Sequence, residues 1–152
     1  MFTQYNPDAL RAYCRSIYGD KRLLLTPQIY SDRPSDTLDD GVNGGNIQIT
    51  QNADFILLGY AIVALGAGGL TIPTIQGTIM FSDSGSGEQF MSRAAMFQNC
   101  LTTPYASMQH TLHWPRFIGG NSSVAYSFTN LSGETLTDIF MSIIGFNIRE
   151  YA

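Results

Sequence analysis

The sequence predicts an all-β fold: an antiparallel β-sandwich, jelly-roll-like in arrangement, preceded by a short helical or extended N-terminal arm. Short apolar or alternating segments recur between turn-forming residues from position 46 onward, a pattern typical of sandwiches and jelly rolls. The chain also contains 15 Gly and 6 Pro, residues that favour turns. Strands and helices do not alternate along the chain, so a parallel α/β sheet is not expected.

The 152 residues fit one folded domain. We expect residues 1–45 to form an N-terminal arm and linker, and residues 46–152 to form the sandwich. Charged residues make up 13% of the chain, about half of the usual ~25%. Hydrophobic residues make up 44%, which excludes a disordered composition.

The N-terminal segment contains one predicted helix. Asn6 or Asp8 can cap it, and Gly19 is the expected C-terminal stop. Four apolar residues between these ends follow the i, i+3, i+4, i+7 spacing of one helical stripe. They are Leu10, Tyr13, Cys14 and Ile17. Residues 31–45, rich in Asp and Gly, predict an exposed loop or linker.

Strand patterns begin at residue 46. Ile47 and Ile49 alternate with polar neighbours, as in a half-buried strand. The apolar run Phe55–Ala64 predicts a strand buried on both faces. Val124, Tyr126 and Phe128 alternate in a later strand. Further strands are expected over 71–81, 90–98, 108–114 (ended by Pro115) and 137–148, with turns at 83–87, 119–122 and 130–133.

The charge balance bears on possible partners. With 8 basic against 12 acidic residues, the net charge is −4, which argues against a nucleic-acid partner. The longest apolar stretch, Phe55–Leu70, is shorter than the ~20 residues of a membrane span and contains several glycines, so no membrane partner is expected. No signal peptide is expected either. Cys14 and Cys100 are most simply free and buried.

Catalytic and cofactor motifs are not evident, so neither an enzyme nor a cofactor is expected. His110 and His113 point to opposite faces on a strand and have no third ligand at a typical spacing. The segment Asp83–Glu88 lacks the order of a calcium loop, and a hairpin turn is the better interpretation. Asp36, Asp39 and Asp40 fit a solvent-facing loop.

Two groups of residues are candidates for interactions. Arg11, Arg15 and Arg22, with Lys21, fall early in the chain. Such an uneven distribution is typical of a segment that meets an acidic surface, although a solvated helix face is the simpler alternative. The aromatic residues Tyr105, Trp114 and Phe117 flank prolines. If exposed, they would stack on sugars or form an interface. If buried, they are one end of the core.

Several segments together resemble small virion structural proteins of tailed bacteriophages, over about residues 46–152. The resemblance lies in the pattern of strands and turns rather than in a catalytic signature. The segments are Ala53–Gly59 (ADFILLG), Gln76–Gly85 (QGTIMFSDSG), His113–Phe117 (HWPRF), Asn121–Ser132 (NSSVAYSFTNLS) and the closing Phe140–Tyr151.

The resemblance implies a non-enzymatic protein of the virion, most simply a capsid decoration or cement protein. Its partners would be further copies of itself and the major capsid protein. In that case the basic residues of the arm would meet an acidic capsid face, and Leu23, Leu24 and Leu25 would add a strand to a neighbour or fill a groove. The alternatives are a collar or tail protein, a carbohydrate- or receptor-binding module, and, least favoured, an enzyme.

Overall fold

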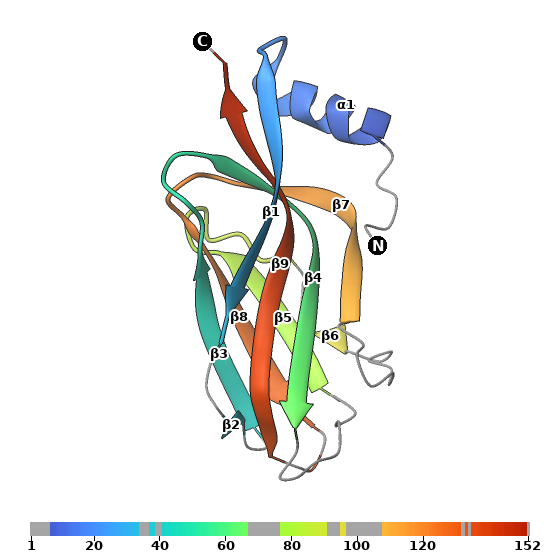
Figure 1. Cartoon of the computed structure of the whole chain (residues 1–152), viewed down its shortest axis with the longest axis vertical. Helices are drawn as coiled ribbons and strands as arrows, with labels where there is room; N and C mark the ends of the chain where they lie inside the picture. Colours follow the sequence, from blue (N-terminus) through green and yellow to red (C-terminus); the bar gives the residue numbers. More distant parts are fainter. Residues whose placement is uncertain are drawn as a thin grey trace.

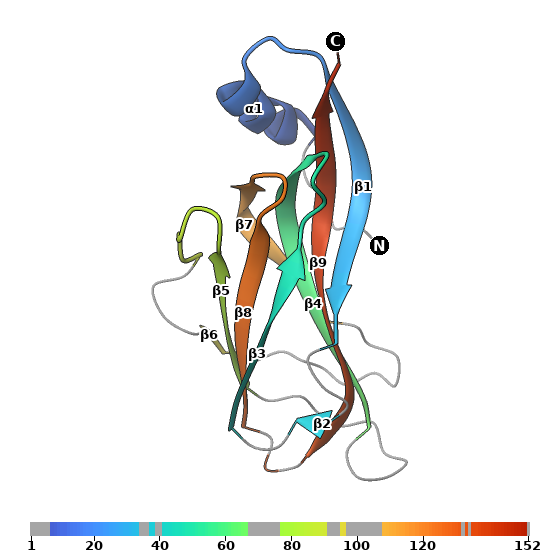
Figure 2. The same cartoon turned by 90° about the vertical axis from the view of Figure 1, so that its left-hand side faces the viewer.

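The computed structural model describes residues 7–33, 37–38, 41–66, 77–90, 95–96, 108–131, 133 and 135–151. One helix precedes two antiparallel sheets, which pack face to face (Figures 1 and 2). The elements are α1 (Pro7–Tyr18), β1 (Leu23–Asp32), β2 (Thr37–Leu38), β3 (Gly41–Gln48), β4 (Asp54–Gly66), β5 (Gly77–Asp83), β6 (Ala95–Met96), β7 (Met108–Ile118), β8 (Ser123–Asn130) and β9 (Leu136–Glu150).

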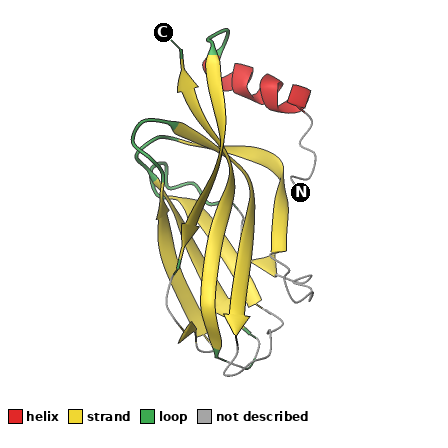
Figure 3. Ribbon diagram, viewed as in Figure 1, coloured by secondary structure: helices red, strands yellow, loops and turns green. Residues whose placement is uncertain are grey.

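The strand order is that of a jelly roll. The first sheet has the order β1-β9-β4-β7, with the short β2 also paired to β9. The second sheet has the order β3-β8-β5-β6. Along the chain, successive strands pass repeatedly from one sheet to the other, as in a double-sheet jelly roll. Strands dominate the described chain, and the helix lies at one end (Figure 3). The predicted fold class, an all-β antiparallel sandwich with a helical N-terminal segment, is confirmed.

The core lies between the two sheets. Residues of β5 and β8 are alternately buried and half-buried, so one face of the second sheet packs inward. The predicted inward residues of β8 are buried, and Phe128 is 1% exposed. The residues of the first sheet that pack against them include Phe55, Leu57, Ile62, Ile139, Met141 and Ile143. Burial of these apolar side chains is the main force that holds the two sheets together.

The predicted helix is confirmed, and it covers the outer face of the first sheet at one end (Figure 2). Leu10 and Cys14 are buried there against Ile56 and Ile148. Gly19 ends the helix with φ +66°, and its N–H donates to Arg15 O over 2.9 Å. A positive φ is accessible to glycine at little cost.

The segment expected to be an arm contributes β1, β2 and most of β3 to the sandwich. β1 pairs with β9 in unbroken register from Leu23↔Glu150 to Asp32↔Met141. The prediction of a loop over 31–45 is wrong for residues 31–32, 37–38 and 41–45, which belong to β1, β2 and β3. The expected boundary at 45/46 falls inside β3. Glycine here permits close packing: a Cβ on Gly44 would lie 2.8 Å from Tyr126 O.

The prediction that Pro115 ends a strand is also wrong, since β7 continues to Ile118. The register between β4 and β7 shifts between Leu57 and Gly59, which indicates a bulge beside the proline. β7 is also the last strand of its sheet. Edge strands and bulges are the places where a sheet accommodates a residue without an N–H donor. Pro27 likewise lies in β1, at the opposite edge of the same sheet.

The predicted turns at 83–87 and 119–122 are confirmed. Asp83 and Glu88 are joined by a backbone hydrogen bond of 2.8 Å that closes the first turn. Asn121 adopts φ 63° in the second, a conformation that asparagine tolerates better than most residues. The strand expected over 71–81 is described only from Gly77, and the one over 90–98 only at β6 and Phe90. Cys100 lies outside the described residues.

Candidate functional site

A groove between α1 and the start of β1 brings together five of the residues that the sequence singled out as interaction candidates: Arg11, Arg15, Lys21, Leu23 and Leu25. Its volume is about 390 Å³. Leu10 and Cys14 form the buried side of the groove, and Leu23 and Leu25 of β1 pack against the same cluster. The lining also includes the charged residues Arg11, Arg15, Asp20 and Lys21. We call this surface the α1–β1 groove.

The floor of the α1–β1 groove is uncharged. Burial raises the pKa of the Cys14 thiol, because the thiolate is poorly solvated there. The thiol therefore stays protonated near neutral pH and behaves as a small apolar side chain. Cys14 is a free cysteine, as the sequence predicts. These features favour apolar contact over nucleophilic chemistry at this floor.

The rim of the α1–β1 groove is mostly basic. Lys21 Nζ lies 2.8 Å from Glu150 Oε1, in an exposed pair. Arg11 Nη1 lies 3.7 Å from Asp8 Oδ1, and both side chains are highly exposed. Exposed pairs of this kind contribute only ~0–1 kcal/mol, so both cations remain available to an acidic partner. Among the described residues, Arg15 forms no ion pair.

The charge around this end of the molecule contrasts with that of the chain as a whole. The chain carries a net charge of −4. Yet five of its 8 basic residues lie on α1, on the turn that follows it or on the end of β9. These are Arg11, Arg15, Lys21, Arg22 and Arg149, against Asp8, Asp20 and Glu150. Asp54, which contacts Tyr18 of α1, adds a fourth carboxylate, so this end is slightly positive on a negative protein.

Two tyrosines fasten α1 to the sandwich. Tyr18 Oη donates to Asp54 Oδ2 over 2.6 Å, and Asp54 Oδ1 also accepts the N–H of Gly120 at 2.8 Å. Tyr13 Oη accepts the N–H of Phe117 at 3.0 Å. Burial, followed by the bond to the Asp54 carboxylate, raises the pKa of Tyr18. The neutral phenol is thus the form that holds the helix and keeps one wall of the groove in place.

The other predicted site residues are placed differently. Leu24 is 41% exposed and, one position out of phase with Leu23 and Leu25, points to the other face of its strand. Arg22 is exposed beside the groove but does not line it. Instead of adding to a neighbouring molecule, Leu23–Leu25 pair with β9 of the same chain.

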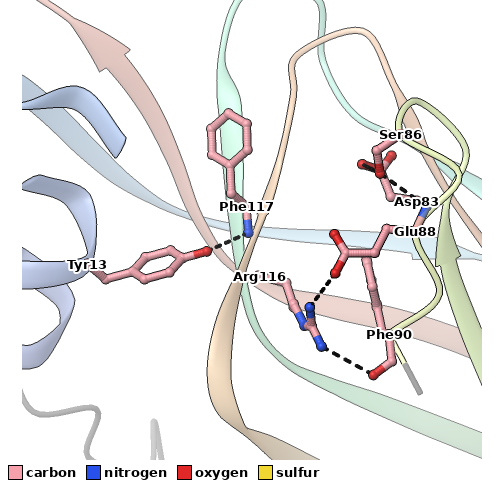
Figure 4. A network of polar contacts seen from close by, with 7 residues as sticks. All are labelled: Tyr13, Asp83, Ser86, Glu88, Phe90, Arg116 and Phe117. Atoms are coloured by element: carbon pink, nitrogen blue, oxygen red, sulfur yellow. Dashed lines mark hydrogen bonds and ion pairs between the residues drawn. The ribbon is translucent and has the colours of Figure 1, made fainter. Parts of the chain in front are cut away.

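The expected aromatic cluster is only partly described. Phe117 is 37% exposed and lies on the opposite side of α1 from the α1–β1 groove, beside Tyr13 (Figure 4). Tyr105 lies outside the described residues. Strand β7 contains Trp114, His110 and His113. Their side chains lie outside the part of the chain that the structure describes. Within the described residues, no group of three or more His, Cys, Asp or Glu side chains is placed to hold a metal ion.

Comparisons with known proteins add little. No family model matches the chain, and no curated protein matches it significantly. One solved structure, dimeric latent PorU from Porphyromonas gingivalis, aligns with a TM-score of 0.37 and 11% identity. The alignment covers 82% of this chain but only 13% of the PorU chain, and a similarity at this level carries no functional argument. Across the described parts of the chain, no helix has the length and apolarity needed to cross a membrane.

Proposed function

We propose that the protein is a non-enzymatic structural component of a virion, a capsid decoration or cement protein that docks through the α1–β1 groove onto an acidic surface of the capsid. The observation that carries the proposal is the grouping of Arg11, Arg15 and Lys21 around an apolar floor. An interface of this kind combines apolar burial, which gives affinity, with charges that orient the partner.

The positive end of the molecule supports this mode of docking. Cations clustered at one end of a net-negative protein orient it as it approaches an acidic surface and increase its association rate. The jelly roll is compatible with the proposal because viral capsid domains use it, although lectins and other proteins use it too. Copies bound side by side would supply the self-association that the resemblance implies.

A cosedimentation assay tests the proposal. The purified chain is mixed with capsid shells of the virus that encodes it, and bound copies are counted as the protein concentration rises. We expect saturation at a stoichiometry that matches the capsid lattice. The chain should also be present in purified particles. Its absence from them refutes a virion role, and its presence in particles without binding to shells assigns it to the collar or tail.

Paired variants test the docking surface. Arg15→Glu reverses one exposed charge on the rim, and Arg33→Glu makes the same change next to Phe140, at a distance from the groove. We expect Arg15→Glu to weaken binding about tenfold, with most of the loss in the association rate and in the salt dependence. Arg33→Glu should change it little. Equal effects of the two variants would contradict docking through the α1–β1 groove.

A further inference from the structure

Strand β1 has one paired edge and one free edge. It is the end strand of its sheet, and among the described strands its hydrogen-bonded neighbour is β9. The backbone groups of successive residues point alternately to the two edges of a strand. Arg22 O accepts the N–H of Tyr151 over 2.9 Å, so the even-numbered residues of β1 face β9. The N–H and C=O groups of Leu23 and Leu25 therefore point away from β9, and no other described residue bonds to them.

This free edge borders the α1–β1 groove. The side chains of Leu23 and Leu25 lie on the face of the sheet that α1 covers, and they line the groove. A strand laid along the free edge would place every second side chain on that same face. Those side chains would lie beside the apolar floor that Leu10 and Cys14 form. One extended ligand can thus use both the backbone groups of the edge and the apolar surface of the groove, as in β-strand addition.

The opposite face of the sheet carries positive charge at this edge. Leu24 is 41% exposed, and its cross-strand partner is Arg149, so the two side chains share a face. Arg22 lies two residues before Leu24 and points to that face too. Both arginines are exposed, and neither forms an ion pair with another described residue. An added strand would therefore gain from apolar side chains on its groove side and from carboxylates on the other side.

The length of the free edge limits the ligand to a short segment. Pro27 has no N–H and leaves a gap in the row of donors that faces away from β9. Between the turn after α1 and this proline, Leu23 and Leu25 offer complete pairs of an N–H and a C=O group. A few extended residues are enough to pair with both.

We propose that the free edge of β1 binds, as an added strand, an extended acidic segment of a partner protein in which apolar residues alternate with Asp or Glu. The apolar side chains enter the α1–β1 groove, and the carboxylates face Arg22 and Arg149. The combination of an unpaired backbone edge, an apolar groove on one face and cations on the other carries the inference. It rests on the proposed function for the docking surface and names the form of the acidic partner that this surface takes.

Synthetic peptides test the inference on the full chain, without capsid shells. The probe is a short, dye-labelled peptide of alternating leucine and glutamate, titrated by fluorescence anisotropy. One control contains the same residues with the leucines and glutamates in separate blocks, and a second has lysine in place of glutamate. We expect the alternating acidic peptide to bind at least about tenfold more tightly than either control. Equal binding of the block peptide, or preference for the lysine peptide, would overturn the proposal.

Backbone methylation separates strand addition from docking through side chains alone. In an added strand only alternate N–H groups donate to β1. N-methylation of the leucines and N-methylation of the glutamates should therefore differ: one should weaken binding about tenfold or more, and the other should change it little. Amide hydrogen exchange should slow at Leu23 and Leu25 when the peptide binds, and stay constant at Leu24, which already faces β9. Equal effects of the two methylations, or unaltered exchange at Leu23 and Leu25, would refute strand addition.

Paired proline variants test the same edge from the side of the protein. Leu25→Pro removes an N–H that faces away from β9, beside the groove. Ile29→Pro makes the same change beyond Pro27, at a 54% exposed residue that does not line the groove. We expect Leu25→Pro to weaken peptide binding about tenfold or more and Ile29→Pro to change it little; equal effects would contradict the site. Urea unfolding checks that each variant is folded, and the peptide series does not depend on either variant.

The outcomes are distinguishable from those of the cosedimentation assay. If capsid shells bind the chain but the alternating peptide does not, strand addition is overturned and the proposed function stands. If the peptide binds and the shells do not, the edge site is supported and the capsid is excluded as its source. Binding to vesicles of anionic phospholipid, with none to the peptide, would assign the basic surface to a lipid and overturn the proposal.

Discussion

The attachment of α1 to the sandwich leads to a quantitative prediction for Tyr18→Phe. The substitution keeps the ring, and with it the contact with Phe117, but removes the 2.6 Å hydrogen bond to Asp54. A hydrogen bond to a charged group contributes about 1.5–3 kcal/mol. Asp54 is only half-buried and keeps the N–H of Gly120, so water can replace the phenol and the lower end of the range applies. We therefore expect α1 to lose about 1.5 kcal/mol of docking free energy.

Amide hydrogen exchange measures this loss directly. A helix of 12 residues is marginally stable alone, so undocking of α1 exposes its amides. A loss of about 1.5 kcal/mol corresponds to roughly tenfold faster exchange across the helix. The amides of β8, in the centre of the second sheet, should exchange as before.

Tyr151→Phe is the matched control for this experiment. Tyr151 is 56% exposed and lies beyond the end of β9, so loss of its hydroxyl should leave α1 unchanged. Unaltered exchange of α1 in Tyr18→Phe would show that the bond to Asp54 does not hold the helix. Equally accelerated exchange in α1 and β8 would show that the helix and sandwich unfold as a single unit. Either result refutes the reasoning.

Three further predictions concern the sandwich. Gly145→Ala should abolish soluble folded protein, measured as yield and circular dichroism, because the new Cβ would clash with the backbone oxygen of Ile56 in the middle of the first sheet; a folded variant would contradict this. Phe128→Ala should cost about 3–5 kcal/mol in urea unfolding, since its side chain is 1% exposed; a loss below about 1 kcal/mol would contradict this. Burial and carboxylate hydrogen bonds raise the pKa of both Tyr18 and Tyr126. The contribution of these two phenols to stability should therefore be constant below about pH 10 and be lost as pH rises further; a urea midpoint unchanged between pH 8 and pH 11 would contradict the assignment.

Local patterns were sufficient to predict much of this fold. The helix follows from its apolar spacing and from Gly19, and β8 follows from the alternation of Val124, Tyr126 and Phe128. β3 was missed in part because its glycines resemble those of a loop. They are required instead by the approach of Tyr126 from the neighbouring strand, and no local pattern contains that information.

The candidate sites also differ in this respect: local sequence patterns predict some of their residues, and contacts between distant segments determine the others. The sequence supplied Arg11, Arg15, Leu23 and Leu25, which are close together along the chain and share one groove. The Arg116–Glu88 pair joins β7 to the turn after β5, and Tyr13 reaches the N–H of Phe117 only because α1 folds back onto the end of β7. Nothing in the spacing of these residues indicates either contact. The charged pair was missed because one residue of a strand, Arg116, and one residue of a distant turn, Glu88, form no motif.

Pro27 lies within the ten residues of β1, at the open edge of the first sheet. Because pairing with β9 continues through Pro27 without a shift, its missing N–H belongs to the side that faces away from β9. The exposed row of backbone donors is therefore interrupted. Prolines at such edges hinder strand-to-strand growth between molecules. Even when many copies are crowded together, this edge is poorly suited to propagating a continuous intermolecular sheet, which favours discrete and reversible contacts over fibrous aggregation.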